Sequence, residues 1–422
     1  MTSADGYTLL YALGVLLLAA ALVHLLNLVS RSLWQALVRV RRERLEWRLL
    51  GQRLDREVLA FTLEQGRGRG LWHGQRKLRV ARKVAEGEGV CSLWLEPHDG
   101  GELPAFLPGQ YLTFEFRLPG EPKPLTRCYS LSGNPLETAR YRVTVKRQSP
   151  PEDHPEYPAG RISSLIHDRV QEGDILDVLA PAGHFTLDAA CHQDLVLIAG
   201  GIGITPQLSK LYALAAGERS RDVWFFYGVR HGGEAVFSEE LRHLAAGRDW
   251  LKTLICYSRP RPEDQAAPGV HLGKRVEMAL LREMLPSLNA EFHLCGPPAM
   301  MTSLYAGLLA AGVPEEKVVF EAFGPASIRR RAGNVETAPR TVRFLRSGKE
   351  AVWDENAGTL LELAERLGVP MESGCRAGNC GSCLTAIKKG GVTHLTPPGP
   401  GLAAGTCLAC IAQPESDLDV DA

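Results

Sequence analysis

The chain lacks the features that would place it in several common functional classes. Its 48 lysines and arginines balance 48 aspartates and glutamates, so the chain lacks the net positive charge that is typical of nucleic-acid-binding proteins. The 12 histidines form no recognisable ligand set, and no serine–histidine–acid or paired-carboxylate site is evident. Cysteines are few, ten in 422 residues, yet five of them lie between Cys375 and Cys410. Such a local group indicates a metal site in a reducing compartment, whereas a scattered even set would suit secreted disulfides.

The amino terminus carries the one long apolar run. Tyr7–Val29 has no formal charge, and about 20 apolar residues suffice for a helix to span a bilayer. A cleaved signal peptide is the alternative, but it would want a basic segment before the run, where only Asp5 is charged. Basic residues instead follow the run: Arg31, Arg39, Arg41, Arg42, Arg44 and Arg48. By the positive-inside rule we expect a single-pass anchor in the cytoplasmic membrane, with the rest of the chain in the cytoplasm.

Length and local patterning predict a multidomain protein. The expected parts are a transmembrane anchor (1–30), a basic amphipathic segment (31–75), an antiparallel barrel (76–187), an α/β domain (188–325), a linker (326–339) and a domain that contains the cysteine group (340–422). The basic segment reads either as a helix on lipid headgroups or as a solvated linker helix. GRGRG at 66–70 would end any such helix.

Two strand patterns distinguish the central parts. Short alternating segments such as VCSLWLEP, YLTFEFRL and YRVTVKR predict an antiparallel β-barrel. Beyond them, continuous apolar runs such as DLVLIA, DVWFFYGV and EFHLCG recur between helical stretches. Such runs are typical of buried parallel strands with crossover helices, so an α/β domain is expected. The last part alternates strand and helix before the cysteines, which suits an α+β β-grasp fold.

The cysteine group has a defined spacing. Cys375, Cys380 and Cys383 form C-x4-C-x2-C, and Cys410 follows downstream, which is the plant-type [2Fe–2S] arrangement. A structural zinc site is the alternative, but zinc usually takes paired C-x2-C halves. Cys407 also precedes the last segment; LACIAQP resembles the usual fourth-ligand strand of plant-type ferredoxins and so favours Cys410.

A flavin motif gives the first resemblance to a known family. Arg127-Cys128-Tyr129-Ser130 matches R-x-Y-S, and residues 78–324 resemble the ferredoxin–NADP reductase superfamily. The resemblance implies that Arg127 pairs with flavin phosphate, that Tyr129 packs on the isoalloxazine, and that Ser130 hydrogen-bonds near N5. Ordinary barrel packing is the alternative for Tyr129. Further implied flavin-site residues are Thr144, Val145 and Lys146 on a strand, and Gly160, Arg161, Ile162 and Ser163 at a helix start.

The nicotinamide motifs follow in the family's order. A glycine-rich loop after DLVLIA matches GGxGxTP, where glycines let the backbone approach a pyrophosphate. In relatives the cysteine of the later Cys-Gly-Pro-Pro motif lies beside the nicotinamide C4, which implies the same position for Cys295. The alternative role for Cys295 is that of a buried structural thiol. Phe323, in E-x-F-G, is expected near the flavin face. The implied nicotinamide-site residues are Gly200, Gly201, Gly203, Ile204, Thr205, Pro206, Arg230, Cys295, Gly296, Pro297 and Phe323.

Both nucleotide cofactors allow two choices. RCYSLSGNP and GRISSLIHD resemble FAD-binding relatives more closely, so FAD is favoured over FMN. Ser258 and Arg259, with Arg261, end the third strand of the nucleotide domain. In NADP-using relatives a serine–arginine pair here holds the 2′-phosphate, which slightly favours NADPH over NADH. These arginines fit exposed loop positions equally well.

The motifs together predict an electron relay. The order flavin, nucleotide, [2Fe–2S] resembles phthalate dioxygenase reductase-like enzymes, so hydride would pass to flavin and single electrons through the cluster to a partner. A Rieske oxygenase, a membrane hydroxylase or desaturase, and a cytochrome P450 all fit as that partner. One alternative is a subunit of a respiratory NADH:quinone-type complex, in which the ferredoxin domain would precede the flavin domain. The other is a redox sensor without turnover.

Overall fold

The computed structural model describes most of the chain beyond residue 70. The described residues are 71–72, 74–121, 124–150, 155–187, 191, 193–217, 221–266, 268–323, 339–354, 357–374, 376, 378, 381–395 and 402–422, with His24, Arg31 and Trp34. The chain separates into two units, Met1–Leu59 and Ala60–Ala422. The expected membrane span lies outside the described residues except for His24, and so does most of the basic segment. Within the described part, no helix is long and apolar enough to cross a membrane.

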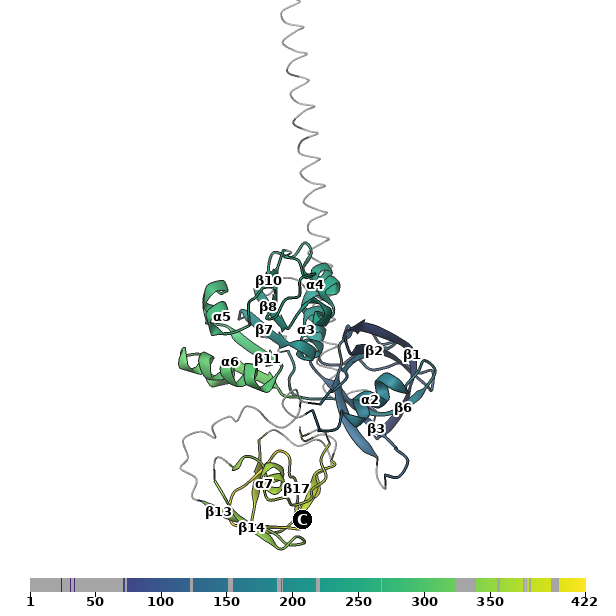
Figure 1. The fold of residues 1–422 in the computed structure, drawn as a ribbon, viewed down its shortest axis with the longest axis vertical. Helices are drawn as coiled ribbons and strands as arrows, with labels where there is room; N and C mark the ends of the chain where they lie inside the picture. The colour runs from purple at the N-terminus through teal and green to yellow at the C-terminus, as the bar shows by residue number, and fades with distance from the viewer. Residues whose placement is uncertain are drawn as a thin grey trace, which may run out of the picture. The chain divides into compact units, whose positions relative to one another are not determined.

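The first domain is a closed antiparallel sheet (Figure 1). Its strand order is β4-β3-β6-β1-β2-β5, and every neighbouring pair is antiparallel. A bridge between Leu131 and Val143 joins the end strands and closes the barrel. The strands are β1 (Gln75–Gly87), β2 (Val90–Pro97), β3 (Tyr111–Phe116), β4 (Leu125–Ser130), β5 (Tyr141–Lys146) and β6 (Ile175–Ala182). Ile162 and Ile166 of α2 (Arg161–Asp168) pack on the barrel core, which fixes the start of this helix near the barrel.

The second domain is a parallel sheet covered on both faces. The order is β10-β9-β8-β7-β11-β12, with all pairs parallel. Its elements are β7 (Leu195–Gly200), η1 (Gly201–Gly203), α3 (Ile204–Ala216), β8 (Val223–Val229), η2 (Gly232–Glu234), α4 (Ser238–Ala245), β9 (Leu251–Tyr257), β10 (Val270–Leu272), α5 (Met278–Met284), β11 (Glu291–Cys295), α6 (Pro298–Ala310), η3 (Glu315–Lys317) and β12 (Val318–Glu321).

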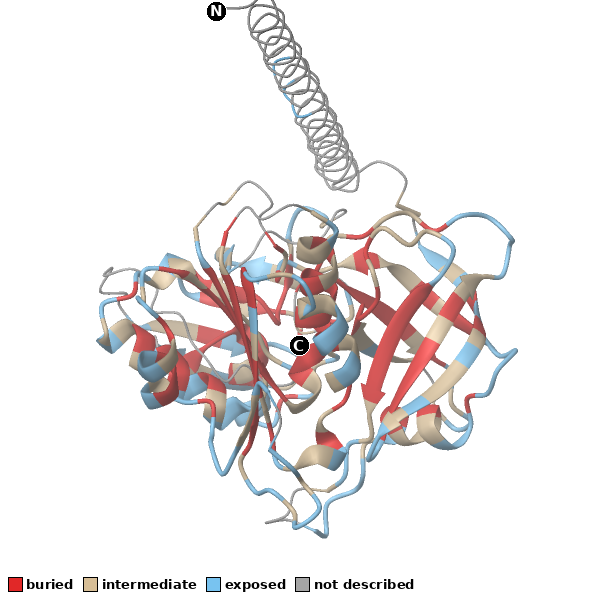
Figure 2. Ribbon diagram, turned by 90° about the horizontal axis from the view of Figure 1, so that it is seen from above, coloured by how far each residue is buried: buried red, intermediate tan, exposed pale blue. Residues whose placement is uncertain are grey.

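Two apolar layers explain why its strands are continuous hydrophobic runs. Alternate residues of β7 pack under α3 and α4 in one core, and the intervening residues pack under α5 and α6 in the other. Figure 2 shows buried residues along these central strands. The strand order reverses between β7 and β11, so a crevice for a nucleotide is expected at their carboxyl ends.

In its described residues the last domain has a mixed sheet and one α-helix, which fits the expected β-grasp fold. Its order is β14-β13-β19-β15-β17, with β13 parallel to β19 and the other pairs antiparallel. Helix α7 begins with a capping box between Thr359 and Glu362. The elements are β13 (Arg340–Phe344), β14 (Lys349–Trp353), α7 (Leu360–Arg366), β15 (Leu384–Lys389), β16 (Val392–His394), β17 (Thr406–Leu408), β18 (Ala412–Pro414) and β19 (Leu418–Val420).

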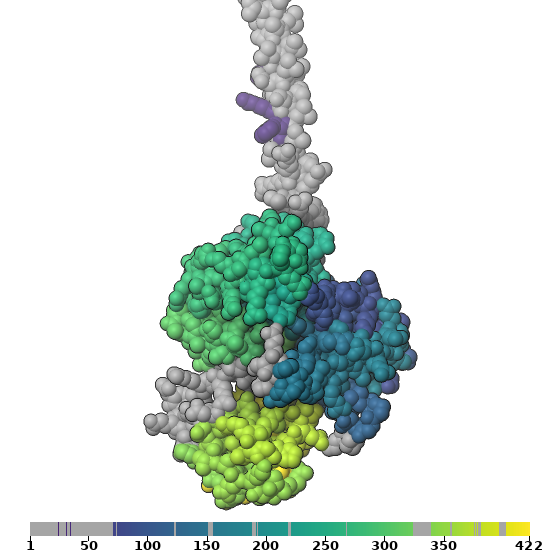
Figure 3. All heavy atoms as spheres, viewed as in Figure 1, coloured from purple at the N-terminus to yellow at the C-terminus, as the bar shows by residue number. Residues whose placement is uncertain are grey.

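Polar contacts join the barrel to the nucleotide domain, whose surfaces adjoin in Figure 3. Arg142 of β5 forms an ion pair of 2.7 Å with Glu240 of α4, and only 4% of the arginine side chain is exposed. The Gly109 amide donates to Ser209 Oγ of α3 at 2.8 Å. A hydrogen bond between Ser130, at the end of β4, and Glu321 of β12 also crosses this boundary, next to the end of β11.

Candidate functional site

The flavin motif occupies strand β4 at the end of the barrel sheet. Arg127 is exposed, and its guanidinium donates to the Thr126 carbonyl at 2.7 Å. Tyr129 lies edge-on to Phe114, with ring centroids 5.7 Å apart. Ser130 is buried at the strand end. An exposed cation, a half-buried ring and a hydroxyl therefore follow one another along one strand, which suits a phosphate, an aromatic ring and a redox nitrogen.

Other predicted flavin-site side chains are used within the barrel. The Cys128 thiol lies 3.3 Å from the Thr113 hydroxyl. Thr144 is buried, and its hydroxyl lies 2.8 Å from those of Ser92 and Ser132. Val145 is part of the apolar core.

The start of α2 offers open backbone amides. No side chain caps this helix at Gly160, so its first amides are available to a phosphate. A Cβ on Gly160 would come within 2.6 Å of Ser163 Oγ. That hydroxyl donates to the Gly160 carbonyl at 3.0 Å and accepts from the Gln148 amide at 3.1 Å, which fixes the turn. Arg161 forms an ion pair with Glu121 at 2.7 Å, whereas Ile162 is buried in the barrel core.

Two glycine motifs pack directly against each other at the sheet crevice. A Cβ on Gly203 would lie 2.1 Å from the Cys295 carbonyl oxygen, and one on Gly296 would lie 2.9 Å from Gly200 Cα. The structure therefore unites the GGxGxTP loop with the Cys-Gly-Pro-Pro segment. Gly201 has a φ of +51°. The remaining members support the loop: Ile204, Thr205 and Pro206 are buried in the first turn of α3, and Pro297 caps α6.

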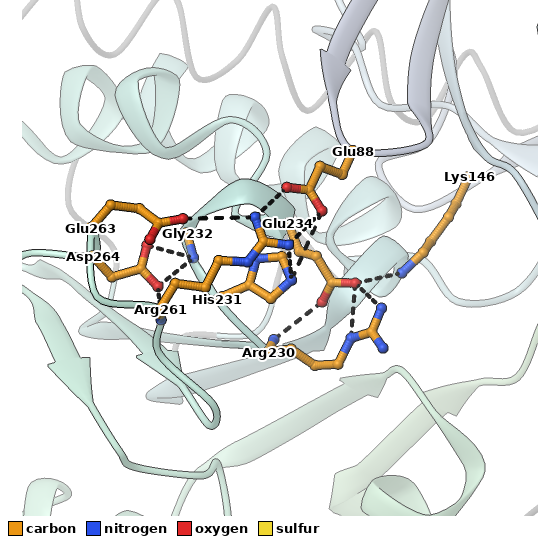
Figure 4. A network of polar contacts seen from close by, with 9 residues as sticks. All are labelled: Glu88, Lys146, Arg230, His231, Gly232, Glu234, Arg261, Glu263 and Asp264. Carbon is orange, nitrogen blue, oxygen red and sulfur yellow. Dashed lines mark hydrogen bonds and ion pairs between the residues drawn. The ribbon is translucent and has the colours of Figure 1, made fainter. Parts of the chain in front are cut away.

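A charged network surrounds Arg230 beside this crevice (Figure 4). Glu234 pairs with the Arg230 guanidinium at 2.5 Å and with Lys146 of the barrel at 3.5 Å. Burial would raise the pKa of Glu234, but the hydrogen bond from Arg230 and the charge of Lys146 hold that pKa at about 2. Glu234 therefore stays ionised and joins two cations from different domains.

The three residues at the end of β9 differ in their availability. Ser258 Oγ donates to the Val229 carbonyl at 3.2 Å. Arg261 is held by Glu88 of the barrel at 2.5 and 2.9 Å, and this hydrogen bond lowers the pKa of Glu88. Arg259 is exposed, and no described residue pairs with its guanidinium. Of the two arginines, Arg259 is the one available to a ligand phosphate.

A partly buried carboxyl group, that of Glu321, lies where the flavin and nicotinamide motifs meet. Ser130 Oγ donates to Glu321 Oε2 at 3.4 Å, across the domain boundary. Burial raises the pKa of Glu321 to about 7, against the opposing charge of Lys210. Burial also raises the pKa of the Cys295 thiol far above its usual value, so Cys295 stays protonated. Phe323 is half exposed at the end of β12.

Sequence reasoning missed Glu321 as a site residue. The motif E-x-F-G contains it, but only its phenylalanine was given a role. A glutamate at the end of an apolar parallel strand, in register with Cys295, is the signal that could have found it. Lys210 was missed because a lysine in a helical stretch is usually a surface residue.

The ferredoxin domain brings two predicted cluster ligands together. Cys383 Sγ lies 3.1 Å from Cys410 Sγ, and both are buried. Cys375 and Cys380 lie outside the described residues, and in the described part no three metal-binding side chains meet. Cys410 lies in the turn after β17 and not on a strand; Cys407 lies on β17, fully buried, opposite Thr385. Burial raises the pKa of the Cys407 thiol to about 12.

The loop around these cysteines is shaped by glycine. Gly378 has a φ of +77°, and a Cβ there would lie 2.5 Å from Ile411 Cδ1. Gly381 has a φ of +73°. Both conformations disfavour residues with a side chain, so glycine suits this tight loop. The donor set and the loop thus fit a cluster held by thiolates.

Comparisons with known proteins agree with this arrangement. Residues 197–305 match the oxidoreductase NAD-binding domain, and residues 343–415 match the 2Fe-2S iron-sulfur cluster binding domain. A flavohemoprotein of Burkholderia sp. (strain TH2) is 40% identical over 268 residues, 63% of each chain. The flavohem-like FAD/NAD-binding domain of nitric oxide dioxygenase from Vibrio cholerae is 31% identical, with a TM-score of 0.51 over 60% of this chain and all of that one. Phthalate dioxygenase reductase is 28% identical, with a TM-score of 0.50 over 83% of this chain and 98% of that one.

Fold and site define an NAD(P)H-dependent flavin and iron–sulfur oxidoreductase. The chain belongs to the ferredoxin–NADP reductase superfamily, with the domain order of phthalate dioxygenase reductase. Its cofactors are FAD, NAD(P)H and a [2Fe–2S] cluster, as the motifs predicted. The chain spans about 63% of the length of the flavohemoproteins it matches first.

Proposed function

We propose that the chain is a membrane-anchored reductase that passes electrons from NAD(P)H through FAD and the [2Fe–2S] cluster, one at a time, to a separate oxygenase-type protein. One observation carries this proposal. The three modules stand in the same order as in phthalate dioxygenase reductase, which matches along 98% of its length. That protein is described as a modular structure for electron transfer from pyridine nucleotides to [2Fe-2S].

The residues of the chain divide the work by position. When bound, FAD supplies hydride acceptance and the cluster supplies one-electron transfer. Arg127 and the amides at the start of α2 would hold FAD phosphates, and Tyr129 would face its ring system. The Gly203–Cys295 contact would seat the nicotinamide nucleotide in the crevice. Ser130 and Glu321 would hold a proton at the meeting point of the two.

A truncation tests whether the cluster is the exit for electrons. A fragment ending near Ser327 keeps the barrel and nucleotide domains and loses the ferredoxin domain. It should reduce ferricyanide with NAD(P)H at the rate of the full chain, yet reduce cytochrome c at least about tenfold more slowly. Equal cytochrome c rates would show that electrons leave from flavin. Failure of the full chain to reduce any acceptor would instead favour a redox sensor.

The anchor is proposed from the charge-free run Tyr7–Val29 and the arginines after it. NAD(P)H is found in the cytoplasm, and thiolate-bound clusters are assembled there. We therefore expect the catalytic domains to face the cytoplasm. The full chain should then resist carbonate extraction, and removal of residues 1–30 should release it with dye-reductase activity intact. Recovery of the full chain in the soluble fraction would contradict the anchor and leave the reductase assignment in place.

The partner is proposed as a Rieske oxygenase, a membrane hydroxylase or desaturase, or a cytochrome P450. An anchor favours a membrane-bound partner, because confinement to one bilayer raises the effective concentration of the two proteins. Loss of residues 1–30 should therefore lower turnover with such a partner while the ferricyanide rate is unchanged. Equal turnover with and without the anchor would favour a soluble acceptor.

A further inference from the structure

The turn between β1 and β2 of the barrel lies against η2 of the nucleotide domain. The Glu88 amide in this turn donates to the Gly233 carbonyl at 3.2 Å. A Cβ on Gly87 would lie 3.0 Å from the same carbonyl oxygen and 2.9 Å from Val236 Cγ1. This close approach of the two backbones places the Glu88 side chain against the nucleotide domain, although Glu88 belongs to the barrel (Figure 4).

The Glu88 carboxylate holds the Arg261 guanidinium by two hydrogen bonds. Arg261 Nη1 donates to Oε1 of Glu88 at 2.5 Å, and Nη2 donates to Oε2 at 2.9 Å. Nη2 also donates to His231 Nε2 at 3.0 Å. The hydrogen bond from Arg261 lowers the pKa of Glu88, so the carboxylate stays ionised at neutral pH. Arginine binds a phosphate group through the same pair of N–H groups, so a carboxylate in this position competes with a phosphate.

The backbone that carries Arg261 is fixed by contacts that do not involve Glu88. The Asp264 carboxylate accepts hydrogen bonds from the backbone amide of Arg261 at 2.7 Å and from that of Gly232 at 3.1 Å. A Cβ on Gly232 would lie 2.3 Å from Asp264 Oδ1. The loop after β9 is therefore tied to η2 after β8, and a change of the Glu88 side chain removes none of these bonds.

The place of Arg261 in the sheet indicates which part of a dinucleotide it meets. The glycine loop follows β7, and β8 and β9 are the next strands on the side away from β11. In nucleotide-binding sheets the pyrophosphate lies at the glycine loop, and residues beyond the neighbouring strand contact the adenosine ribose. His231 follows β8 and contacts Arg261, which follows β9. We therefore expect Arg261 at the ribose end of the crevice, where NADPH carries a 2′-phosphate and NADH a hydroxyl.

We propose that Glu88 is a specificity-determining residue, which disfavours NADPH relative to NADH by occupying Arg261. A 2′-phosphate must displace the Glu88 carboxylate before it pairs with the guanidinium, and the carboxylate adds a negative charge beside it. The ribose hydroxyl of NADH meets neither obstacle. A residue of the barrel thus sets the choice of nucleotide in the neighbouring domain. The inference requires that the chain binds NAD(P)H, and it is independent of the anchor, the acceptor and the electron route.

A purely structural role for the same pair makes a different prediction. If Glu88 and Arg261 only fasten the barrel to the nucleotide domain, loss of the pair should affect ligands with and without a 2′-phosphate alike. Glu263 is the matched control for charge. Its Oε1 lies 3.9 Å from Arg261 Nη1, and its side chain is exposed. Glu263→Gln therefore removes the same charge beside the same cation while Glu88 still holds the guanidinium.

The test compares two ligands that differ only in the 2′-phosphate, adenosine 2′,5′-bisphosphate and 5′-AMP. Their dissociation constants for the oxidised holoenzyme are measured by calorimetry at one ionic strength. Glu88→Gln keeps the shape of the side chain, and it should tighten binding of the bisphosphate at least about fivefold while 5′-AMP changes less than about twofold. Glu263→Gln should change each constant less than about twofold. In an Arg261→Ala background, Glu88→Gln should give no gain for the bisphosphate.

Four results would overturn the proposal. Unchanged binding of the bisphosphate in Glu88→Gln would place Arg261 away from the 2′-phosphate, and equal changes for both ligands would assign the pair to the domain junction. An equal gain in Glu263→Gln would assign the effect to the charge of the loop. A full gain in the Arg261→Ala background would show that Glu88 acts without Arg261. Because binding is measured without turnover, failure of the electron route proposed above would leave each of these outcomes readable.

Discussion

Lys210 shows how one buried side chain sets a pH dependence. Burial lowers its pKa from 10.5 to about 7. Between about pH 7 and 10 the unfolded chain therefore binds more protons than the folded one, and stability rises with pH in that window. Lys210→Met should remove this slope, which is at most about 1.4 kcal/mol per pH unit.

Thermal unfolding of the holoenzyme, followed by flavin fluorescence from about pH 7 to 9.5, measures this effect. Exposed Lys252 of β9 provides the control, and Lys252→Met should keep the wild-type slope. An unchanged slope in Lys210→Met would place the pH dependence on other groups.

The choice of the fourth cluster ligand is also decided by single residues. Cys410 lies beside Cys383, whereas Cys407 is fully buried on β17. Cys410→Ala should abolish cluster absorbance and bound iron, and Cys407→Ala should retain both. The reverse pattern would exchange the two assignments. Metal analysis and visible absorbance of the purified variants provide the measurement.

Single residues also mark the limit of sequence prediction. The residues of the local motifs could be predicted, because the spacing of the glycines, of the cysteines and of the R-x-Y-S segment is typical of cofactor binding. Glu321, Lys210 and Glu88 could not, because their contacts arise only when the nucleotide domain and the barrel pack together. Thr144 shows the opposite case: the motif predicts a flavin contact, but the Thr144 hydroxyl lies against the hydroxyls of Ser92 and Ser132 inside the barrel.

At the scale of elements, the contact between the start of α3 and the end of β11 forms the nucleotide crevice. A Cβ on Gly203 would lie 2.1 Å from the Cys295 carbonyl oxygen, which belongs to backbone and cannot rotate away. Gly203→Ala should therefore separate the two elements and raise the KM for NAD(P)H at least about tenfold, while bound FAD is retained.

Gly247→Ala is the control for glycine substitution itself. Gly247 also has a positive φ, but no atom lies within 4 Å of its would-be Cβ. Gly247→Ala should lower the free energy of unfolding by about 1 kcal/mol and leave the KM for NAD(P)H unchanged. A normal KM in Gly203→Ala would mean that the crevice does not hold the nucleotide.

The end of β9 yields a prediction about cofactor choice. Arg259 is exposed, whereas Arg261 is held by Glu88. If Arg259 contacts a 2′-phosphate, Arg259→Ala should raise the KM for NADPH at least about fivefold more than that for NADH. Steady-state kinetics with both nucleotides measure the ratio, and an unchanged ratio would place the contact elsewhere.

Elements with strong patterns were predicted well from the sequence. Alternation gave β2, β3 and β5, and buried runs gave β7, β8, β9 and β11, because burial on one or two faces leaves a direct mark on composition. Strands β6 and β12 were not singled out. Strand β12 has four residues and ends on Glu321, which contacts Ser130 of the barrel, so its pattern reflects a tertiary contact as well as the sheet.

At the scale of the whole molecule, the order of the modules was predictable because each carries a local motif. The anchor and its orientation stay predictions, since the apolar run lies outside the described residues apart from His24. The electron route is the central claim of this account, and it concerns how the modules act in sequence. The rate at which the cluster is reduced tests this claim, whereas the amount of bound cofactor does not.

The most direct test is rapid mixing of the oxidised full chain with one equivalent of NAD(P)H, with freeze-quench detection of the reduced cluster by electron paramagnetic resonance. The account predicts that the cluster becomes reduced at a rate equal to or faster than steady-state turnover with cytochrome c. Cluster reduction slower than that turnover would contradict it, because electrons would then reach the acceptor without passing through the [2Fe–2S] centre.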